Sequence, residues 1–86
     1  MVIYTITYAS LCDNQLYTET KAFSDRESLM KAFAGYIRDI AENIDDPDEN
    51  EEFVKKYATF TPEAHWESWS GYEMYTLTSS EHIINA

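Results

Sequence analysis

The chain has 86 residues, of which 44% are hydrophobic and 15% aromatic, and it contains only two glycines and two prolines. This composition favours a single folded domain over residues 1–86 rather than a disordered chain. Sixteen acidic and six basic residues give a formal net charge of -10, which argues against binding to nucleic acid or to an anionic membrane, because both attract Lys and Arg.

The N-terminal part of the chain predicts a β-hairpin. Residues 2–11 are rich in β-branched and aromatic residues with a period of two, so Tyr4 and Tyr8 share one face while Thr5 and Thr7 share the other. Residues 16–23 follow the same pattern. The intervening Asp13-Asn14 suits a two-residue loop whose central positions need a positive φ, so we expect two antiparallel neighbours.

A long amphipathic helix is predicted next. Ser24 as the N-cap and Glu27 three residues later form a capping box. The apolar side chains then recur at steps of three and four residues, namely Leu29, Phe33, Tyr36, Ile37, Ile40 and Ile44. The helix should end near Ile44, because the sequence Asp45-Asp46-Pro47 disfavours its continuation.

A second, shorter helix should begin at once, with Asp46 as N-cap, Pro47 at the first helical position and Glu49 at the third. We expect it to stop by residues 59–62. Residues 71–79 again favour a strand, whereas residues 64–70 fit a strand or a turn, and the tail 80–86 fits a strand end or a docked turn.

These elements predict an α+β fold in the order ββααβ. The N-terminal hairpin and the C-terminal strand form an antiparallel sheet, packed on one face by one long and one short helix. Both faces of the hairpin carry large side chains, and one helix pair cannot cover both.

Two features bear on location. Cys12 is the only cysteine, and a lone thiol fits a reducing compartment, so we expect the cytoplasm. The first eleven residues lack a basic segment and mix Thr and Tyr with aliphatic residues, which is typical of neither a signal peptide nor a membrane span.

Residues 39–52 hold eight carboxylates and no Lys or Arg. Those from residue 46 onward lie near the start of the second helix, where each gains about 0.3–1 kcal/mol from the helix dipole. Asp39, Glu42 and Asp45 instead lie toward the end of the first helix, where acids are disfavoured by a similar amount. Only Glu42 has a nearby partner, Arg38. The cluster therefore costs stability, which makes it a candidate for function; the alternative is a solvated surface that serves solubility.

If the chain stays helical through the junction, carboxylates at 39, 42, 46 and 49 are about 4.5–6 Å apart along the axis. DNA presents one phosphate per about 3.4 Å of axis on each strand. The segment therefore predicts an acidic ridge that imitates a nucleic-acid backbone. A calcium loop is the other interpretation, because Asp46, Asp48 and Asn50 are spaced like the start of an EF-hand, but Glu51 stands where Gly is needed and Tyr57 where Glu is needed.

Trp66, Trp69, Tyr72 and Tyr75 lie within ten positions. They can serve as core residues, or, where flanking polar residues keep them exposed, as anchors for a partner. Recognised catalytic motifs are missing from the sequence, and a nucleophilic pair of Cys12 and His65 is the one alternative left open. With two histidines and one cysteine, we expect no metal, no cofactor and no enzymatic activity.

We therefore interpret the chain as a stoichiometric inhibitor that occludes the nucleic-acid-binding site of a basic protein, such as a nuclease. At the level of class only, it is similar to the small acidic inhibitors that phages and mobile elements carry against CRISPR or restriction nucleases, and to immunity proteins against nuclease toxins. The predicted partner-binding residues are Asp39, Glu42, Asp45, Asp46, Asp48, Glu49, Glu51, Glu52, Trp66, Trp69 and Tyr72. The alternative is a non-catalytic assembly module that forms a homodimer through an exposed sheet face or edge.

Overall fold

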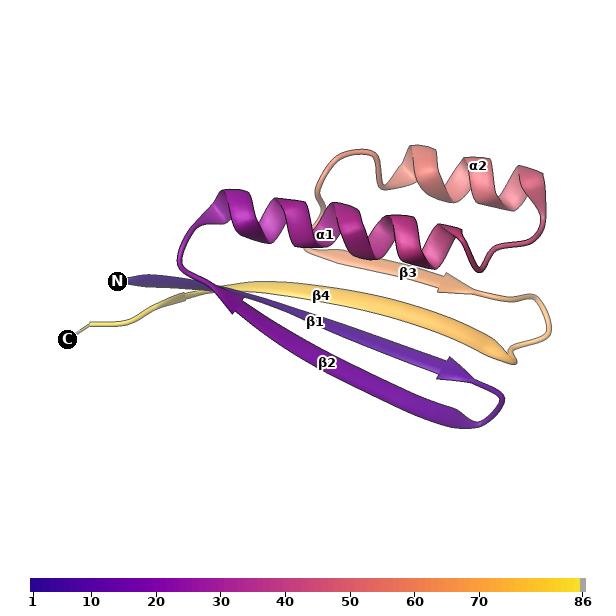
Figure 1. Ribbon diagram of the computed structural model, residues 1–86, viewed down its shortest axis with the longest axis horizontal. Coiled ribbons are helices and arrows are strands. Elements are labelled where there is room, and N and C mark those ends of the chain that lie inside the picture. The colour runs from indigo at the N-terminus through magenta and orange to yellow at the C-terminus, as the bar shows by residue number, and fades with distance from the viewer. Residues whose placement is uncertain (86) are drawn as a thin grey trace.

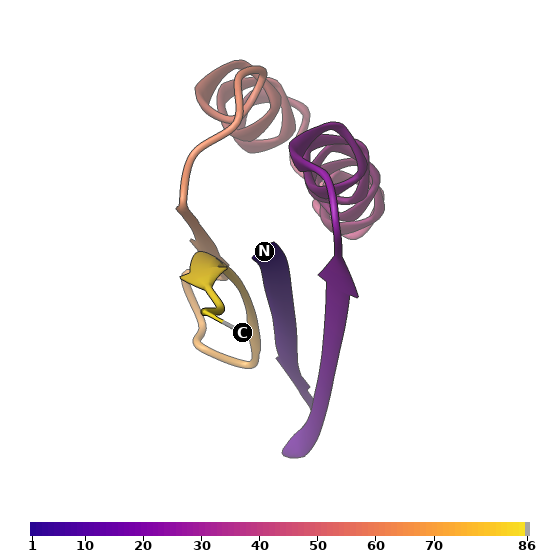
Figure 2. The same ribbon diagram turned by 90° about the vertical axis from the view of Figure 1, so that its left-hand side faces the viewer.

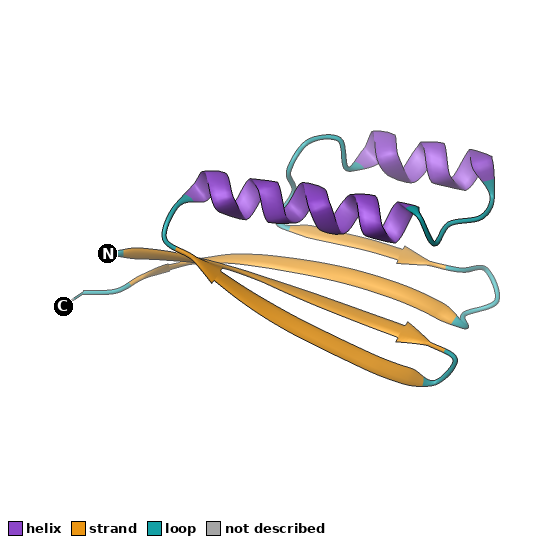
Figure 3. Ribbon diagram, viewed as in Figure 1, coloured by secondary structure: helices purple, strands orange, loops and turns teal. Residues whose placement is uncertain are grey.

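The computed structural model describes residues 1–85, and residue 86, the last of the tail, lies outside the described part. The elements in chain order are β1 (Val2–Cys12), β2 (Gln15–Phe23), α1 (Arg26–Ala41), α2 (Pro47–Lys56), β3 (Glu63–Glu67) and β4 (Glu73–Ile83). The predicted α+β class is confirmed, and β3 adds one strand to the predicted order. Both helices lie on the same side of the sheet (Figure 1 and Figure 3).

The four strands form one antiparallel sheet in the order β2-β1-β4-β3. The predicted hairpin is confirmed, since Cys12 pairs with Gln15 and both residues between them have a positive φ, 50° for Asp13 and 66° for Asn14. β4 pairs with β1 from Glu73 to Ile83, so the first part of the tail continues the strand. This long central pairing brings Met1 beside Ile84, whose carbonyl accepts a hydrogen bond from the N-terminal ammonium at 3.1 Å.

The predicted N-cap of α1 was wrong by one residue. Asp25, not Ser24, has the extended backbone of a cap, and its carboxylate accepts the backbone N–H of Ser28 at 2.8 Å and the Ser28 hydroxyl at 2.9 Å. A carboxylate accepts both bonds at once and also faces the positive end of the helix, which a serine hydroxyl does less well.

α1 ends at Ala41, three residues before the predicted end at Ile44. The Asn50 side-chain amide donates to the Ala41 carbonyl at 2.7 Å and to the Ile44 carbonyl at 3.4 Å. It thereby binds carbonyl groups that a helix end leaves without a partner. α2 begins as predicted, with Asp46 as cap and Pro47 at the first position, and ends at Lys56, which is within the predicted limit at residues 59–62.

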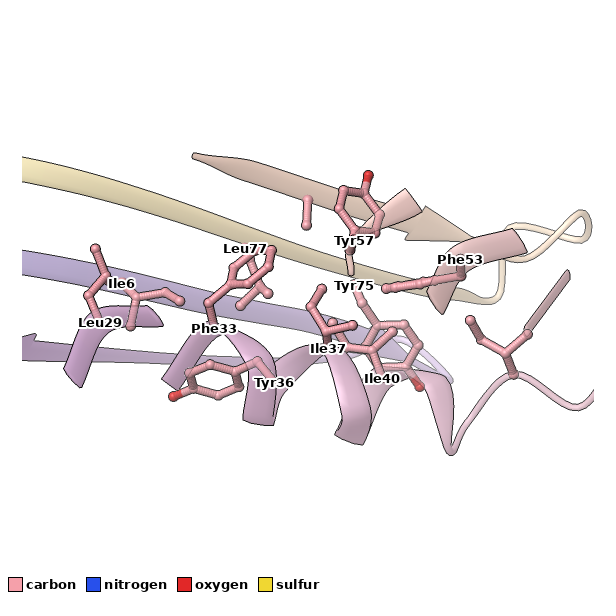
Figure 4. Packing of buried hydrophobic residues seen from close by; sticks show 12 residues of the cluster. Ile6, Leu29, Phe33, Tyr36, Ile37, Ile40, Phe53, Tyr57, Tyr75 and Leu77 are labelled. Carbon is pink, nitrogen blue, oxygen red and sulfur yellow. The ribbon is translucent and has the colours of Figure 1, made fainter. Parts of the chain in front are cut away.

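The core lies between the sheet and the two helices (Figure 4). Its most deeply buried side chains are Ile6 of β1, Ile40 of α1 and Leu77 of β4, each at most 2% exposed. The apolar stripe predicted on α1 faces this core. The core residue Phe33 packs edge-on against the partly buried Phe60, with ring centroids 5.1 Å apart.

A polar contact fastens the edge strand β2 to α1. The Tyr36 hydroxyl donates to Glu19 at 2.6 Å, the Tyr17 hydroxyl donates to its other oxygen at 2.5 Å, and the Lys21 ammonium lies 3.2 Å away. These three groups favour the carboxylate, the tyrosine hydroxyls most strongly, and they lower the pKa of Glu19 to about 2.

Within residues 1–85, no helix lies over the opposite face of the sheet (Figure 2). We call its part on β1, β2 and β4 the open face. The strand register assigns it the residues Ile3, Thr5, Thr7, Ala9, Leu11, Leu16, Thr18, Thr20, Ala22, Met74, Thr76, Thr78, Ser80 and His82. The large side chains on both faces of the hairpin, with one helix pair to cover them, predicted such a bare face.

Candidate partner-binding site

Six of the eleven predicted site residues converge at one end of the molecule, where the α1–α2 junction, the start of α2 and the β3–β4 loop meet (right-hand end of Figure 1). A hollow of about 330 Å³ lies there. Its lining residues come from all three segments and are Asn43, Asp45, Asp46, Glu49, Trp66, Ser68, Trp69, Ser70, Tyr72 and Glu73. Three predicted acids and all three predicted aromatic residues thus share one concave surface, which we call the acidic hollow.

Local hydrogen bonds fix the acidic wall of the hollow. Asp46 Oδ1 accepts the backbone N–H groups of Asp48 at 2.9 Å and Glu49 at 3.0 Å, which caps α2. The Asn43 side chain donates to the Asp39 carbonyl at 2.9 Å, which holds the junction against α1. Both hydrogen bonds of the α2 cap go to Asp46 Oδ1, and within residues 1–85 the second oxygen, Oδ2, accepts no hydrogen bond from the protein. The Asp46 carboxylate therefore still presents charge to the hollow.

The aromatic wall has one packed and two exposed members. Trp66 is half-buried and stacks on Tyr75 of β4 with ring centroids 5.9 Å apart. Trp69 and Tyr72 belong to the loop and are 94% and 67% exposed. The loop is held in shape by the Ser68 N–H, which donates to the Glu73 carbonyl at 2.9 Å, so the exposed rings extend from a defined turn.

The eight acids of residues 39–52 are all exposed, and only Glu51 forms an ion pair in the part of the chain that the structure describes. Its partner is Lys55, with 2.9 Å between Lys55 Nζ and Glu51 Oε1. An exposed i, i+4 pair of this kind contributes only about 0.3–0.5 kcal/mol. The other seven carboxylates therefore leave a strongly negative potential at this end.

The remaining predicted acids lie outside the acidic hollow. Asp48, Glu51 and Glu52 line a shallower depression along α2, together with Lys55. Asp39 occupies the last turn of α1, and Glu42 is its C-cap. Because the helix stops between them and α2, the carboxylates at 39, 42, 46 and 49 do not form the continuous helical ridge that the spacing would allow.

Four lining residues were not predicted from the sequence, namely Asn43, Ser68, Ser70 and Glu73. Glu73 adds a fourth carboxylate from the first position of β4. Every second residue of a strand lies on the same face, so Glu73 shares the helix side of the sheet with the buried Tyr75 and Leu77. This spacing is the signal that could have placed Glu73 on that side.

No family model, curated protein or solved structure matches this chain.

The other chemistry considered from the sequence finds no support in the geometry. Cys12 lies on the helix side of the sheet, with its sulfur 3.4 Å from the Tyr75 hydroxyl, whereas His65 pairs with Thr76 on the opposite side and lies beside Glu67. They form no nucleophilic pair. Residues 47–56, which would belong to a calcium loop, are helical, and no cluster of three metal-ligating side chains occurs within residues 1–85. Neither helix has the length and apolar character that crossing a bilayer requires.

Proposed function

We propose that this protein is a non-enzymatic, stoichiometric inhibitor that occupies the nucleic-acid-binding site of a basic protein in the cytoplasm. The observation that carries the proposal is the acidic hollow, in which unpaired carboxylates and exposed aromatic rings share one surface. Inhibitors of this class act on CRISPR or restriction nucleases on behalf of phages and mobile elements, and we place the chain beside them by its chemistry.

Electrostatics supports a basic partner. A net charge of -10, with half of the sixteen acids in residues 39–52, gives a field that attracts Lys-rich and Arg-rich surfaces and speeds their encounter. On α2, Asp48 and Glu52 are four residues apart and lie about 6 Å apart along the axis. Neighbouring carboxylates on this helix thus offer negative charge at intervals comparable to those of a nucleic-acid strand.

The aromatic residues supply what charge alone does not. A fully exposed Trp gains stability in the free protein from neither burial nor hydrogen bonds, yet Trp and Tyr are the residues enriched at interface hot spots. Beside carboxylates, Trp69 and Tyr72 also present faces over which an Arg guanidinium can stack. Charge then steers the partner, and the rings hold it.

The test is capture of partner proteins from a bacterial lysate, with the purified protein as bait at low and at moderate salt. The hollow variant Asp45→Asn/Glu49→Gln is compared with the matched variant Glu27→Gln/Glu81→Gln, which removes two charges at the other end of the molecule. We expect the hollow variant alone to lose the captured protein, and duplex DNA to displace that protein from the unmodified bait.

Salt gives a second readout, since attraction between exposed charges is screened over about 8–10 Å at moderate ionic strength. Capture that is equal at both salt concentrations, or that both double variants retain, would remove the basis of the proposal. Binding that duplex DNA fails to displace would show that the partner's nucleic-acid site is not the surface occupied.

A further inference from the structure

The open face differs from an ordinary solvated sheet face in its lack of charge. The chain has 22 charged residues, sixteen acidic and six basic, yet the register assigns none of them to the open face on β1, β2 and β4. Two carboxylates on the same side of the sheet, Glu63 and Glu67 of β3, pair with Thr78 and Met74 and so border the open face along β4. β2 and β4 do contain four charged residues, Glu19, Lys21, Glu73 and Glu81, and the register assigns all of them to the helix side. An antiparallel sheet with one solvated face usually has the reverse arrangement, with its charges turned to water.

Threonines and apolar residues make up most of the open face, and they lie opposite one another across the strands. Across its centre, Thr7 of β1 lies opposite Thr20 of β2 and Thr78 of β4, and the hydroxyls of Thr7 and Thr20 are 3.0 Å apart. Near the hairpin turn, the row that crosses the same three strands is entirely apolar and consists of Leu16, Leu11 and Met74. Leu16 is 71% exposed. Short side chains leave this part of the sheet even, and the long charged groups on the same side, Glu63 and Glu67, lie along its β3 border.

From this distribution of charge we propose that the open face binds a second copy of the same chain, as a symmetric dimer in which two sheets pack face to face. Two copies at -10 repel each other through almost any other pair of surfaces. A basic partner is attracted to the acidic end instead, because two carboxylates, Glu63 and Glu67 on β3, border the open face, against eight in residues 39–52. A self-complementary neutral patch is what a twofold interface requires, because the same surface serves both copies.

The area is sufficient for a weak dimer. β1, β2 and β4 have 11, 9 and 11 residues. At about 3.3 Å per residue and about 4.8 Å between strands, they cover a rectangle of about 500 Å² on each copy. The two copies together bury about 1,000 Å², which is at the lower end for a specific interface. We therefore expect a reversible dimer that depends on protein concentration.

The experiment is sedimentation equilibrium of the full chain over a range of protein concentrations, at low and at moderate salt. We expect a mass that rises with concentration toward twice that of one chain, and a dissociation constant that falls as salt is added, because salt screens the repulsion between the two copies. This proposal does not depend on the proposed function, whose binding to a basic partner weakens with salt.

Thr7→Arg is the decisive variant. It reduces the magnitude of the negative net charge, from -10 to -9, so repulsion alone would favour the dimer, but it places a charge at the centre of the proposed interface. We expect its dissociation constant to rise at least about tenfold. Thr59→Arg makes the same change at an exposed residue between α2 and β3 and should not weaken the dimer. Thr20→Arg, at the exposed edge strand, is the second variant and decides the matter if Thr7→Arg does not fold.

A chain that stays monomeric at all concentrations and salts overturns the proposal and leaves the open face to another protein or to water. A dimer that survives both interface variants overturns it as well, because its interface must then lie elsewhere.

Discussion

The two tryptophans of the acidic hollow should respond to truncation in opposite ways. Trp66 stacks on Tyr75 and packs against the core, whereas Trp69 is 94% exposed. Truncating a fully buried Trp to Ala costs about 3–5 kcal/mol. Trp66 is half-buried, so we expect Trp66→Ala to lower the free energy of unfolding by about 2 kcal/mol. Trp69→Ala removes no buried surface, and we expect a change within about 0.5 kcal/mol.

Urea denaturation followed by far-UV circular dichroism measures both values. For a domain of this size, 1 kcal/mol corresponds to about 4–8 °C in melting temperature, so Trp66→Ala should melt roughly 10 °C lower and Trp69→Ala at the wild-type temperature. In the capture assay, Trp69→Ala should lose the partner while it remains folded. A loss of more than about 1 kcal/mol for Trp69→Ala, or none for Trp66→Ala, would refute the assignment of one ring to packing and the other to binding.

Three further variants test the electrostatics of the fold. Asp39→Asn removes an acid from the C-terminal turn of α1 and should raise the free energy of unfolding by about 0.5 kcal/mol at low salt, a gain that fades as salt is added; unchanged stability at low salt would contradict it. Asp46→Ala leaves two backbone N–H groups of α2 without their acceptor and should lower that free energy by about 1 kcal/mol, as measured by urea denaturation. Glu19 has a pKa of about 2 against an ordinary value of 4.5, so its stabilisation is fully present above pH 4.5 and is lost as the pH falls toward 2. The stability difference between wild type and Glu19→Gln should shrink over that interval, and a difference independent of pH would show that the Tyr36 contact does not depend on the carboxylate.

Local signals in the sequence predicted the elements that depend on neighbouring residues. The Asp13-Asn14 turn and the Asp46 cap were predicted correctly, because each depends on the identity of only a few consecutive residues. The end of α1 was wrong because the Asn50 amide that binds the Ala41 carbonyl comes from the next helix. No pattern within α1 contains that information.

In the candidate site too, the local features could be predicted from the sequence and the tertiary arrangement could not. The composition of residues 39–52 indicated where the negative charge lies, and the aromatic cluster was visible in the sequence. That Asp45 and Trp69 share one hollow follows from the pairing of β3 with β4 beneath α2, which places the β3–β4 loop beside the α1–α2 junction. β3 is only five residues long, too short for its alternation to separate a strand from a turn.

The acidic hollow and the open face lie on opposite sides of the sheet, so each can be changed without disturbing the other. The hollow is built from the α1–α2 junction, the start of α2 and the β3–β4 loop, together with Trp66 and Glu73, which the register assigns to the helix side. A dimer formed through the open face would leave the acidic hollow of each copy exposed, so one dimer could bind two basic sites. In that case Thr7→Arg would lower the apparent affinity for a partner with two such sites, through loss of the second attachment, while leaving the affinity for a single site unchanged. An equal loss for single and paired sites would show instead that the substitution had altered the hollow itself.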